Sequence, residues 1–362
     1  MKGEIHIKGR SSIILTGSLF LLLFSCVFVP NRTLSFLVWM AADNNLEDYI
    51  GQDLEEMKEN PSWIDVFAMV DFASSPDTLY RVEGDLIPLK TFNEINSGDP
   101  GALSSFLNKY QGSDLSFLVI WNHGDWWRGE AQARTKGVAY DETNRAFLSV
   151  GEIKSVLRNS PVTVLGFDAC LMGTFEILWV LKDCADYIVV SSKEVPAAGW
   201  NYTALRGVKD LSLLLYRIVQ KYHEMYGEDF SLSVWDTSKL EEVMYWLNSI
   251  SQYMMDNEVS PWSFSVERRT AGSSSTELIE FGSFATALRE SSDGTLRDYG
   301  EKLYDAVVSA RVFGTPEDYT DLLVYLPENV KNPEYWDDFS ALSDFTRDSS
   351  WDDFILYWRD KN

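Results

Sequence analysis

One stretch shows how this chain is organised: Pro161-Val162-Thr163-Val164-Leu165-Gly166-Phe167-Asp168-Ala169-Cys170-Leu171-Met172-Gly173. Its apolar first half predicts a short buried strand, and the strand leads into an aspartate, a small residue and a cysteine. An earlier apolar run, residues 116–121, leads in the same way into Asn122-His123-Gly124. Ligands bind at the carboxyl ends of strands in open α/β sheets, so the two runs predict a thiol and an imidazole delivered to one site.

Apolar runs alternate with helical patterns on both sides of this pair. Strands are predicted at 34–41, 64–70, 187–191 and 230–235, with a hairpin at 79–89, and helices at 46–57, 100–110, 150–157 and 211–226. We expect a further helix to begin at Cys170 and to continue through Leu181. This alternation predicts βαβ units, a mainly parallel sheet and helices on both of its faces.

A soft boundary near residue 237 separates this region from a less regular C-terminal part. Helical patterns recur at 240–255 and 296–308, and an apolar strand is predicted at 322–326. Residues 266–284 are polar and rich in serine and fit neither period. We expect residues 34–236 to form the main α/β domain and residues 237–362 to form a helical or mixed extension packed on it.

The composition limits the classes of partner. With 362 residues, of which 45% are hydrophobic, the chain can bury a large core. A formal net charge of −24 without a basic cluster excludes a nucleic-acid partner, because phosphate binding needs a basic surface. The acidic surface suits cationic partners or substrates, and it serves solubility equally well.

The N-terminus carries targeting information. Lys2, Lys8 and Arg10 precede the apolar run 13–25, so residues 1–25 have the layout of a secretory signal peptide. The run ends in Leu23-Phe24-Ser25-Cys26, which resembles a bacterial lipoprotein cleavage box and predicts lipidation of Cys26. An uncleaved anchor through Val29 is the alternative. Residues 26–33 would form a linker, and we expect an exported protein, extracellular or in the cell envelope, that meets a membrane only through this segment.

Few reactive side chains remain beyond the signal and Cys26. Cysteine occurs only at 170 and 184, and histidine only at 123 and 223. Cys184 and His223 lie beside or within helical patterns, which leaves His123 as the histidine at a strand end. A disulfide between the two cysteines is one alternative in an exported protein. A redox pair lacks the Cys-x-x-Cys spacing, and a zinc site lacks a second histidine at ligand spacing.

The strand-end residues suit acyl transfer. A nearby imidazole and a helix amino terminus both favour the thiolate of Cys170, which makes it a nucleophile. The backbone N–H groups of Gly124 and Cys170 suit a developing oxyanion, and His123 suits protonation of the leaving amine and activation of water. Asp168 has three interpretations: it orients His123, it selects a basic substrate side chain through an ion pair, or it caps the next helix.

These residues resemble the clostripain family of cysteine peptidases, in the clan with the caspase fold. The resemblance covers roughly residues 34–240 and rests on an ordered set of motifs: Val38-Trp39-Met40-Ala41-Ala42-Asp43-Asn44-Asn45-Leu46, Trp121-Asn122-His123-Gly124, Tyr140-Asp141-Glu142-Thr143, Gly166-Phe167-Asp168-Ala169-Cys170-Leu171-Met172-Gly173 and Pro196-Ala197-Ala198-Gly199-Trp200-Asn201-Tyr202. It implies a caspase-like three-layer sandwich in which residues 34–236 are the catalytic domain.

The resemblance also implies roles for individual residues. His123 and Cys170 would form the catalytic dyad, and Asp168 would form the acidic floor of a pocket for Arg or Lys. Family members are often cut once between the histidine and the cysteine, which implies self-cleavage at Arg134 or Lys136 in the loop 125–137; an ordinary exposed segment is the alternative. Lys193 departs from the family pattern, and near Asp168 it would weaken selection of a basic residue.

The resulting hypothesis is a monomeric cysteine endopeptidase acting on peptides and proteins that contain Arg or Lys. We expect it to need no cofactor. Calcium is reported as an activator for some relatives, but the sequence contains no spaced Asp-x-Asp-x-Asp loop. A non-catalytic surface protein that binds peptides on the same fold is the alternative.

Overall fold

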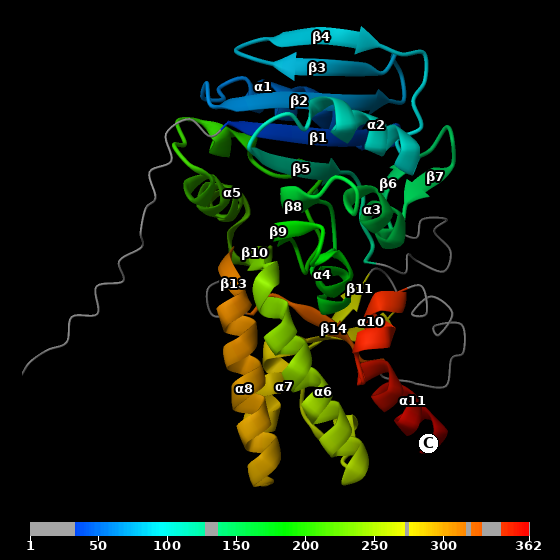
Figure 1. Ribbon diagram of the computed structural model, residues 1–362, viewed down its shortest axis with the longest axis vertical. Helices are drawn as coiled ribbons and strands as arrows, with labels where there is room; N and C mark the ends of the chain where they lie inside the picture. Colours follow the sequence, from blue (N-terminus) through cyan, green and yellow to red (C-terminus); the bar gives the residue numbers. More distant parts are fainter. Residues whose placement is uncertain (1–32, 127–136, 272–274, 316–319, 328–341, 362) are drawn as a thin grey trace, which may run out of the picture. The chain divides into compact units, whose positions relative to one another are not determined.

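The computed structural model describes residues 33–126, 137–271, 275–315, 320–327 and 342–361. Its main feature is a nine-stranded sheet with the order β13-β10-β9-β8-β5-β1-β2-β3-β4 (Figure 1). The strands that pair in parallel at its centre are β2 (Ile64–Phe72), β1 (Leu34–Ala42), β5 (Leu115–Trp121), β8 (Val162–Asp168) and β9 (Ala185–Val190). Antiparallel strands extend both edges: β3 (Thr78–Val82), β4 (Leu86–Thr91), β10 (Leu232–Asp236) and β13 (Arg311–Thr315).

The central strands are buried on both faces. Every residue of β1 is buried, and its side chains alternate between two apolar cores. Leu37, Trp39 and Ala41 belong to one core, whereas Phe36 and Val38 belong to the other. A strand buried on both faces needs apolar side chains on both, which explains the continuous apolar runs in the sequence.

Helices cover the two faces, as the sequence predicts. One core includes residues of α2 (Pro100–Tyr110), α3 (Val150–Leu157) and α4 (Phe175–Leu181). The other includes residues of α1 (Ile50–Met57) and α5 (Leu211–Tyr226). The α/β class with a mainly parallel sheet between helices is confirmed.

The start of α4 differs from the sequence-based expectation. The helix begins at Phe175, five residues after Cys170, and Thr174 caps it by accepting a hydrogen bond from the Ile177 amide. Leu171 has a φ of 60°, a left-handed conformation that a helix cannot contain. Cys170 therefore lies in a turn and not on a helix amino terminus.

Residues beyond 237 form helices and short strands that pack against the same core. The helices are α6 (Leu240–Asp256), α7 (Phe281–Arg289), α8 (Gly294–Ala310), α10 (Ser343–Asp348) and α11 (Trp351–Lys361). A three-stranded sheet consists of β11 (Arg268–Ala271), β12 (Ser275–Glu280) and β14 (Leu323–Tyr325). The described residues from 33 onward form one compact unit, and the boundary after residue 236 stays a prediction.

A hairpin and several short 3-10 helices complete the described structure. The hairpin pairs β6 (Val138–Asp141) with β7 (Ala146–Leu148). The 3-10 helices are η1 (Glu47–Tyr49), η2 (Tyr202–Leu205), η3 (Gly227–Asp229), η4 (Thr237–Lys239) and η5 (Pro261–Ser263). Among the helices described, none combines the length and the apolar character needed to cross a bilayer.

Candidate active site

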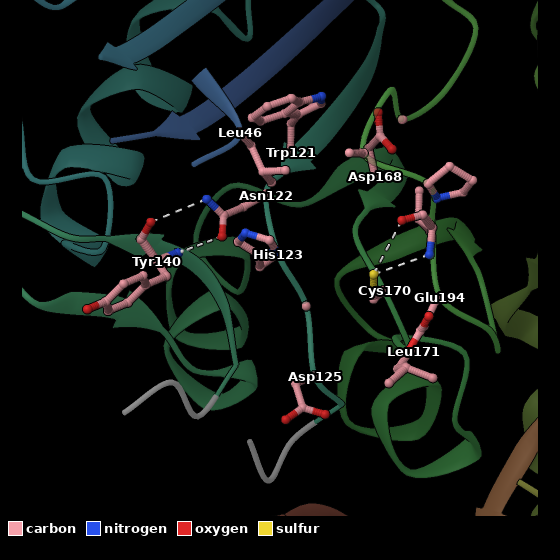
Figure 2. Close-up of a pocket in the computed structure, with 15 residues that line it drawn as sticks. Leu46, Trp121, Asn122, His123, Asp125, Tyr140, Asp168, Cys170, Leu171 and Glu194 are labelled. Atoms are coloured by element: carbon pink, nitrogen blue, oxygen red, sulfur yellow. Dashed lines mark hydrogen bonds between the residues drawn. The ribbon is translucent and has the colours of Figure 1, made fainter. Parts of the chain in front are cut away.

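The carboxyl ends of β5 and β8 meet at a pocket of about 440 Å³. The two strands pair in parallel with Trp121 opposite Asp168, so the segments that follow them emerge side by side. The pocket is lined by His123 and Gly124 from one segment and by Asp168 and Cys170 from the other (Figure 2). The structure thus brings together the four residues that the sequence singles out at these strand ends.

His123 is held by an asparagine that follows β1. Its Nε2 lies 2.7 Å from Oδ1 of Asn45, within hydrogen-bond distance. Burial of part of the ring lowers the pKa of His123, which favours the neutral imidazole. In the sequence, Asn45 stands out only within the motif 38–46 and without a role of its own, so that motif was the available signal.

The Cys170 thiol lies against the backbone of Val195. The Val195 amide donates a hydrogen bond to Sγ over 3.2 Å, and Sγ lies 3.5 Å from the Val195 carbonyl oxygen. Burial raises the pKa of Cys170, as do the nearby carboxylates of Glu194, Asp168 and Asp125, whereas the Val195 amide opposes the rise. The resting side chain is therefore a thiol, contrary to the expectation that a helix amino terminus favours the thiolate.

Gly124 allows the two strand-end segments to approach each other closely. A Cβ atom at position 124 would lie 2.5 Å from the carbonyl oxygen of Cys170 and 2.9 Å from the Cβ of Ala169. Real Cβ atoms do not approach so closely, so a side chain here would push the histidine segment away from the cysteine turn. The sequence indicates only the backbone N–H of Gly124, as a donor to an oxyanion, and not this close approach.

Asn122 fixes the start of the histidine segment. Its side-chain oxygen accepts a hydrogen bond from the Tyr140 amide over 3.0 Å, and its side-chain nitrogen donates to the carbonyl oxygens of Ala41 and Tyr140. Buried polar groups with full sets of partners impose one geometry on their surroundings. Sequence reasoning assigned no role to Asn122.

Asp168 lines the pocket and is 3% exposed. The Trp200 amide donates to both carboxylate oxygens, over 3.1 and 3.0 Å, and the Tyr202 hydroxyl donates to Oδ2 over 2.9 Å. Burial raises its pKa to about 7, although these hydrogen bonds oppose the rise. The capping interpretation is wrong, because Thr174 caps α4, and His123 has Asn45 as its described partner.

A second buried carboxyl lies behind Asp168. Asp53 in α1 is fully buried, and its Oδ2 accepts a hydrogen bond from the Trp121 indole over 2.7 Å. Burial raises the pKa of Asp53 to about 9, and the charge of Asp168 adds to the rise. At neutral pH the Asp53 carboxyl is thus protonated, so it adds no second negative charge beneath Asp168.

Lys193 does not neutralise Asp168. Its ammonium donates to the carbonyl oxygens of Glu228 and Asp229, over 3.3 and 3.1 Å. It lines a different hollow, which does not include Asp168. The departure at position 193 therefore leaves the Asp168 carboxylate without a basic partner from this side chain.

The other reactive residues lie elsewhere. Cys184 is buried and, like Cys170, carries a free thiol, so the disulfide alternative is not realised. His223 lies in α5, as the sequence predicts, and lines a separate cavity. Arg134, Lys136 and Cys26 lie outside the described residues.

A group of carboxylates near this site is able to hold a metal ion. One oxygen from each of Asp43, Asp71, Glu94 and Asp141 lies within 4.8 Å of the others. None of these four residues lines the pocket that contains Cys170. Sequence patterns do not reveal this group, because its members come from four separate segments and not from one spaced loop.

Solved structures of other proteins share the fold of this chain. A solved structure of a secreted C11 cysteine protease from Bacteroides thetaiotaomicron, bound to an irreversible peptide inhibitor, is 17% identical, with a TM-score of 0.70 over 89% of this chain and 99% of that one. An inactive zymogen C11 protease from Parabacteroides distasonis is 18% identical, with a TM-score of 0.67 over 90% of this chain and 99% of that one. At these identities the likeness shows the fold alone.

Sequence comparison identifies the family. Clostripain from Hathewaya histolytica is 29% identical to this chain over 217 residues. The match covers 48% of this chain and only 41% of the length of that protein. The profile of the clostripain family, peptidase family C11, matches residues 38–358. That match includes both strand ends, the pocket between them and most of the C-terminal part, and the chain therefore belongs to the clostripain family.

Proposed function

We propose that this chain is an exported cysteine endopeptidase that cleaves after Arg or Lys with His123 and Cys170 as its catalytic dyad. The observation that carries the proposal is one pocket lined by an imidazole, a thiol and a buried carboxyl. Support comes from the family and from the lack of a competing reactive pair among the described residues, where Cys184 is buried and His223 lies apart.

The reaction would proceed through an acyl-enzyme. The thiol of Cys170 turns from Val195 toward His123, gives its proton to the imidazole, and Sγ attacks the carbonyl carbon of the scissile bond. The N–H groups of Gly124 and Cys170 stabilise the oxyanion. His123 then protonates the leaving amine, and a water molecule that His123 deprotonates hydrolyses the thioester. The raised pKa of Cys170 means that the free protein holds the protonated thiol, so this proton transfer would be part of the reaction.

Asp168 would select the side chain before the cleaved bond. A lysine or arginine that enters the pocket brings its positive charge toward an aspartate held by Trp200 and Tyr202. The ion pair forms away from bulk water and is charge-assisted, which makes it strong. The bound cation also lowers the pKa of Asp168, so substrate and ionised carboxylate stabilise each other.

A substrate profile tests the proposal. Fluorogenic peptides that end in Lys, Arg or Gln before the cleaved bond are offered to the wild type and to four variants. We expect Cys170→Ala and His123→Ala to lose about a thousandfold or more in kcat. Asp168→Asn is expected to lose about a hundredfold in kcat/KM for the Lys and Arg peptides, while the Gln peptide changes little. Glu176→Gln, a buried carboxyl in α4, is the matched control and keeps the profile.

Two outcomes would contradict the proposal in different ways. A retained Arg and Lys preference in Asp168→Asn would overturn the pocket assignment and leave the dyad in place. Peptide binding without turnover by the wild type would favour the alternative, a peptide-binding protein on the same fold.

Self-cleavage at Arg134 or Lys136 is part of the proposal. Both residues follow the histidine segment and carry the charge that Asp168 would select. Incubation of the wild type beside Cys170→Ala checks it: a cut after Arg134 or Lys136 in the wild type alone supports self-cleavage, and the same cut in both contradicts it. We further propose a monomer that reaches a membrane only through a lipid on Cys26 or an uncleaved N-terminal segment.

A further inference from the structure

A second cavity, of about 510 Å³, lies at the edge of the nine-stranded sheet. Most of its walls come from α5, α8 and β13, the strand at one end of the sheet (Figure 1). The rings of Tyr216 in α5 and Phe313 in β13 pack against each other there, with a distance of 5.7 Å between ring centroids. The cavity shares no lining residue with the pocket that contains Cys170, so peptide cleavage at that pocket does not account for it.

Apolar side chains gather around this cavity although water reaches them. Tyr216, Val308 and Val312 line it and are 47%, 48% and 39% exposed. They are three of the seven large hydrophobic side chains that are exposed in the described part of the chain. Single exposed apolar residues are ordinary, but a group of them around one hollow is typical of a binding site.

Two polar atoms of the cavity lining lack a hydrogen-bond partner. Nδ1 of His223 and Oγ1 of Thr315 are both buried, and neither has a partner among the described residues. A buried polar atom without a partner costs free energy, and a ligand that supplies the missing hydrogen bond recovers it. The apolar wall therefore holds polar groups that are able to orient a ligand.

The charge of the lining is opposite to that of the whole protein. The chain has 55 acidic and 31 basic residues, yet the described residues that line this cavity include Arg311 and neither aspartate nor glutamate. The Arg311 side chain lies against Gly314, where a Cβ atom would collide with the guanidinium group. The guanidinium group is thereby brought to the residue before Thr315. An arginine in such a position suits a carboxylate, which accepts two hydrogen bonds from it.

We propose that this cavity binds a small organic carboxylate with an aromatic or branched apolar body. The body packs against the exposed apolar side chains of α5, α8 and β13. The carboxylate accepts hydrogen bonds from the Arg311 guanidinium and from the Thr315 hydroxyl. The acidic catalytic pocket, which is lined by Asp168 and Glu194, does not compete for such an anion.

The cavity lies one residue from a contact that positions the loop at Cys170. Thr320 lines the cavity, and the next residue, Asp321, accepts a hydrogen bond from the Ser192 hydroxyl. Ser192 belongs to the same loop as Val195, whose amide donates to the thiol. A bound ligand would thus bear on this loop. The effect on turnover rests on the proposed function, whereas binding does not.

Ligand-observed NMR with the catalytically inert Cys170→Ala protein tests the proposal. The probe is hydrocinnamate, and hydrocinnamyl alcohol, which has the same body without the charge, is the paired compound. We expect saturation transfer to hydrocinnamate, with an affinity about fivefold or more above that of the alcohol, because only the carboxylate pairs with Arg311.

Two variants in the Cys170→Ala background locate the site. Val312→Glu adds a negative charge at an exposed rim position and is expected to weaken hydrocinnamate binding roughly tenfold or more. Thr315→Val removes the hydroxyl at nearly constant volume and should weaken binding several-fold. Leu89→Glu is the matched control and should bind as the parent does, because Leu89 is a similarly exposed apolar residue on β4, the strand at the opposite end of the sheet.

Three results would overturn the site. They are no saturation transfer to hydrocinnamate, equal affinities for the acid and the alcohol, and equal affinities in Val312→Glu and Leu89→Glu. None of these readouts depends on peptidase activity, so failure here is distinct from failure of the proposed function.

Turnover of a Lys peptide by the protein with Cys170 intact tests the link to the loop. We expect saturating hydrocinnamate to lower kcat by about twofold or more, because displacement of the groups around the thiol is costly, and Val312→Glu to abolish this effect. An unchanged kcat with the cavity occupied would overturn the link and leave the site in place.

Discussion

Under the role proposed for Asp168, its burial would make substrate selection depend on pH. Its pKa is raised to about 7, so in the free protein the carboxylate is ionised above that pH and protonated below it. As pH falls through 7, selection of a cationic side chain is therefore lost. The quantity to measure is the ratio of kcat/KM for a Lys peptide to kcat/KM for a Gln peptide. Ionisation of the proposed dyad affects both values equally, so its effect cancels in this ratio.

We expect this ratio to fall as the pH is lowered from 8 to 6, by up to about tenfold for each unit below the pKa. Asp168→Asn should give a low ratio that does not change with pH. A wild-type ratio that stays constant across the range would contradict the role of Asp168. The measurement needs only initial rates with the two peptides at matched ionic strength.

Individual side chains differ in how far the sequence reveals them. His123, Cys170 and Asp168 could be predicted because reactive residues are scarce and end apolar runs. Asn45 and Val195 could not, because each acts through a contact with a distant segment that only the folded chain creates. The sequence also raised the expectation that Lys193 could approach Asp168 and weaken its selection of a basic residue. In the structure the Lys193 ammonium instead donates to the carbonyl oxygens of Glu228 and Asp229.

At the scale of elements, the loop 191–195 after β9 connects the cysteine turn to the C-terminal part. Backbone amides of Gly173 and Leu171 donate to the carbonyls of Ser191 and Lys193. On its other side, the Ser192 hydroxyl donates to the fully buried Asp321. The loop that contacts Cys170 is thus positioned by a residue far along the chain.

Asp321→Asn should disturb this loop. We expect kcat to fall by roughly tenfold, because small displacements of reacting groups are costly, while KM changes less. Glu280→Gln is the matched control, since Glu280 is buried beside Thr320 but does not contact the loop. Melting temperatures of both variants, with kcat and KM, separate the effects. Equal losses of kcat in the two variants, or an unchanged kcat in Asp321→Asn, would rule out the positioning role.

Helices and strands whose apolar residues recur at a clear spacing could be predicted from the sequence. Those whose bounds depend on tertiary contacts could not. The apolar runs at β1, β2, β5 and β8 and the capped helix α2 agree with the sequence. The start of α4 was misplaced because nothing in the sequence signals the left-handed Leu171. β11, β12 and the start of α7 fall in the serine-rich stretch without a period, where β12 pairs with β11 and with the distant β14.

At the scale of the whole molecule, the C-terminal helices share a core with the site-bearing strands. The ring of Phe175 in α4 packs against Phe281 and Phe345, with distances between ring centroids of 5.3 Å and 6.1 Å. Trp351 of α11 is fully buried, and its indole donates to the Tyr325 carbonyl over 2.6 Å. The part beyond residue 237 therefore contributes apolar contacts on which α4 depends.

Trp351→Ala should destabilise the molecule as a unit. We expect the free energy of unfolding to fall by about 3–5 kcal/mol, the usual cost of a buried tryptophan. Denaturant titration followed by circular dichroism and by residual activity should give one coincident transition at lower denaturant. Trp262→Ala, at a partly exposed aromatic of the same region, should cost less. Two separate transitions, with activity surviving the first, would show that residues 237–362 fold independently.

The two described cysteines differ in access, and this makes them reporters of different events. Cys170 opens onto the pocket, whereas Cys184 is 1% exposed and burial raises its pKa to about 11. An alkylating reagent applied to the folded protein is therefore expected to label Cys170 before Cys184. Cys184 reacts only when its surroundings between α4 and β9 open, so its labelling rate measures local unfolding in the same sample.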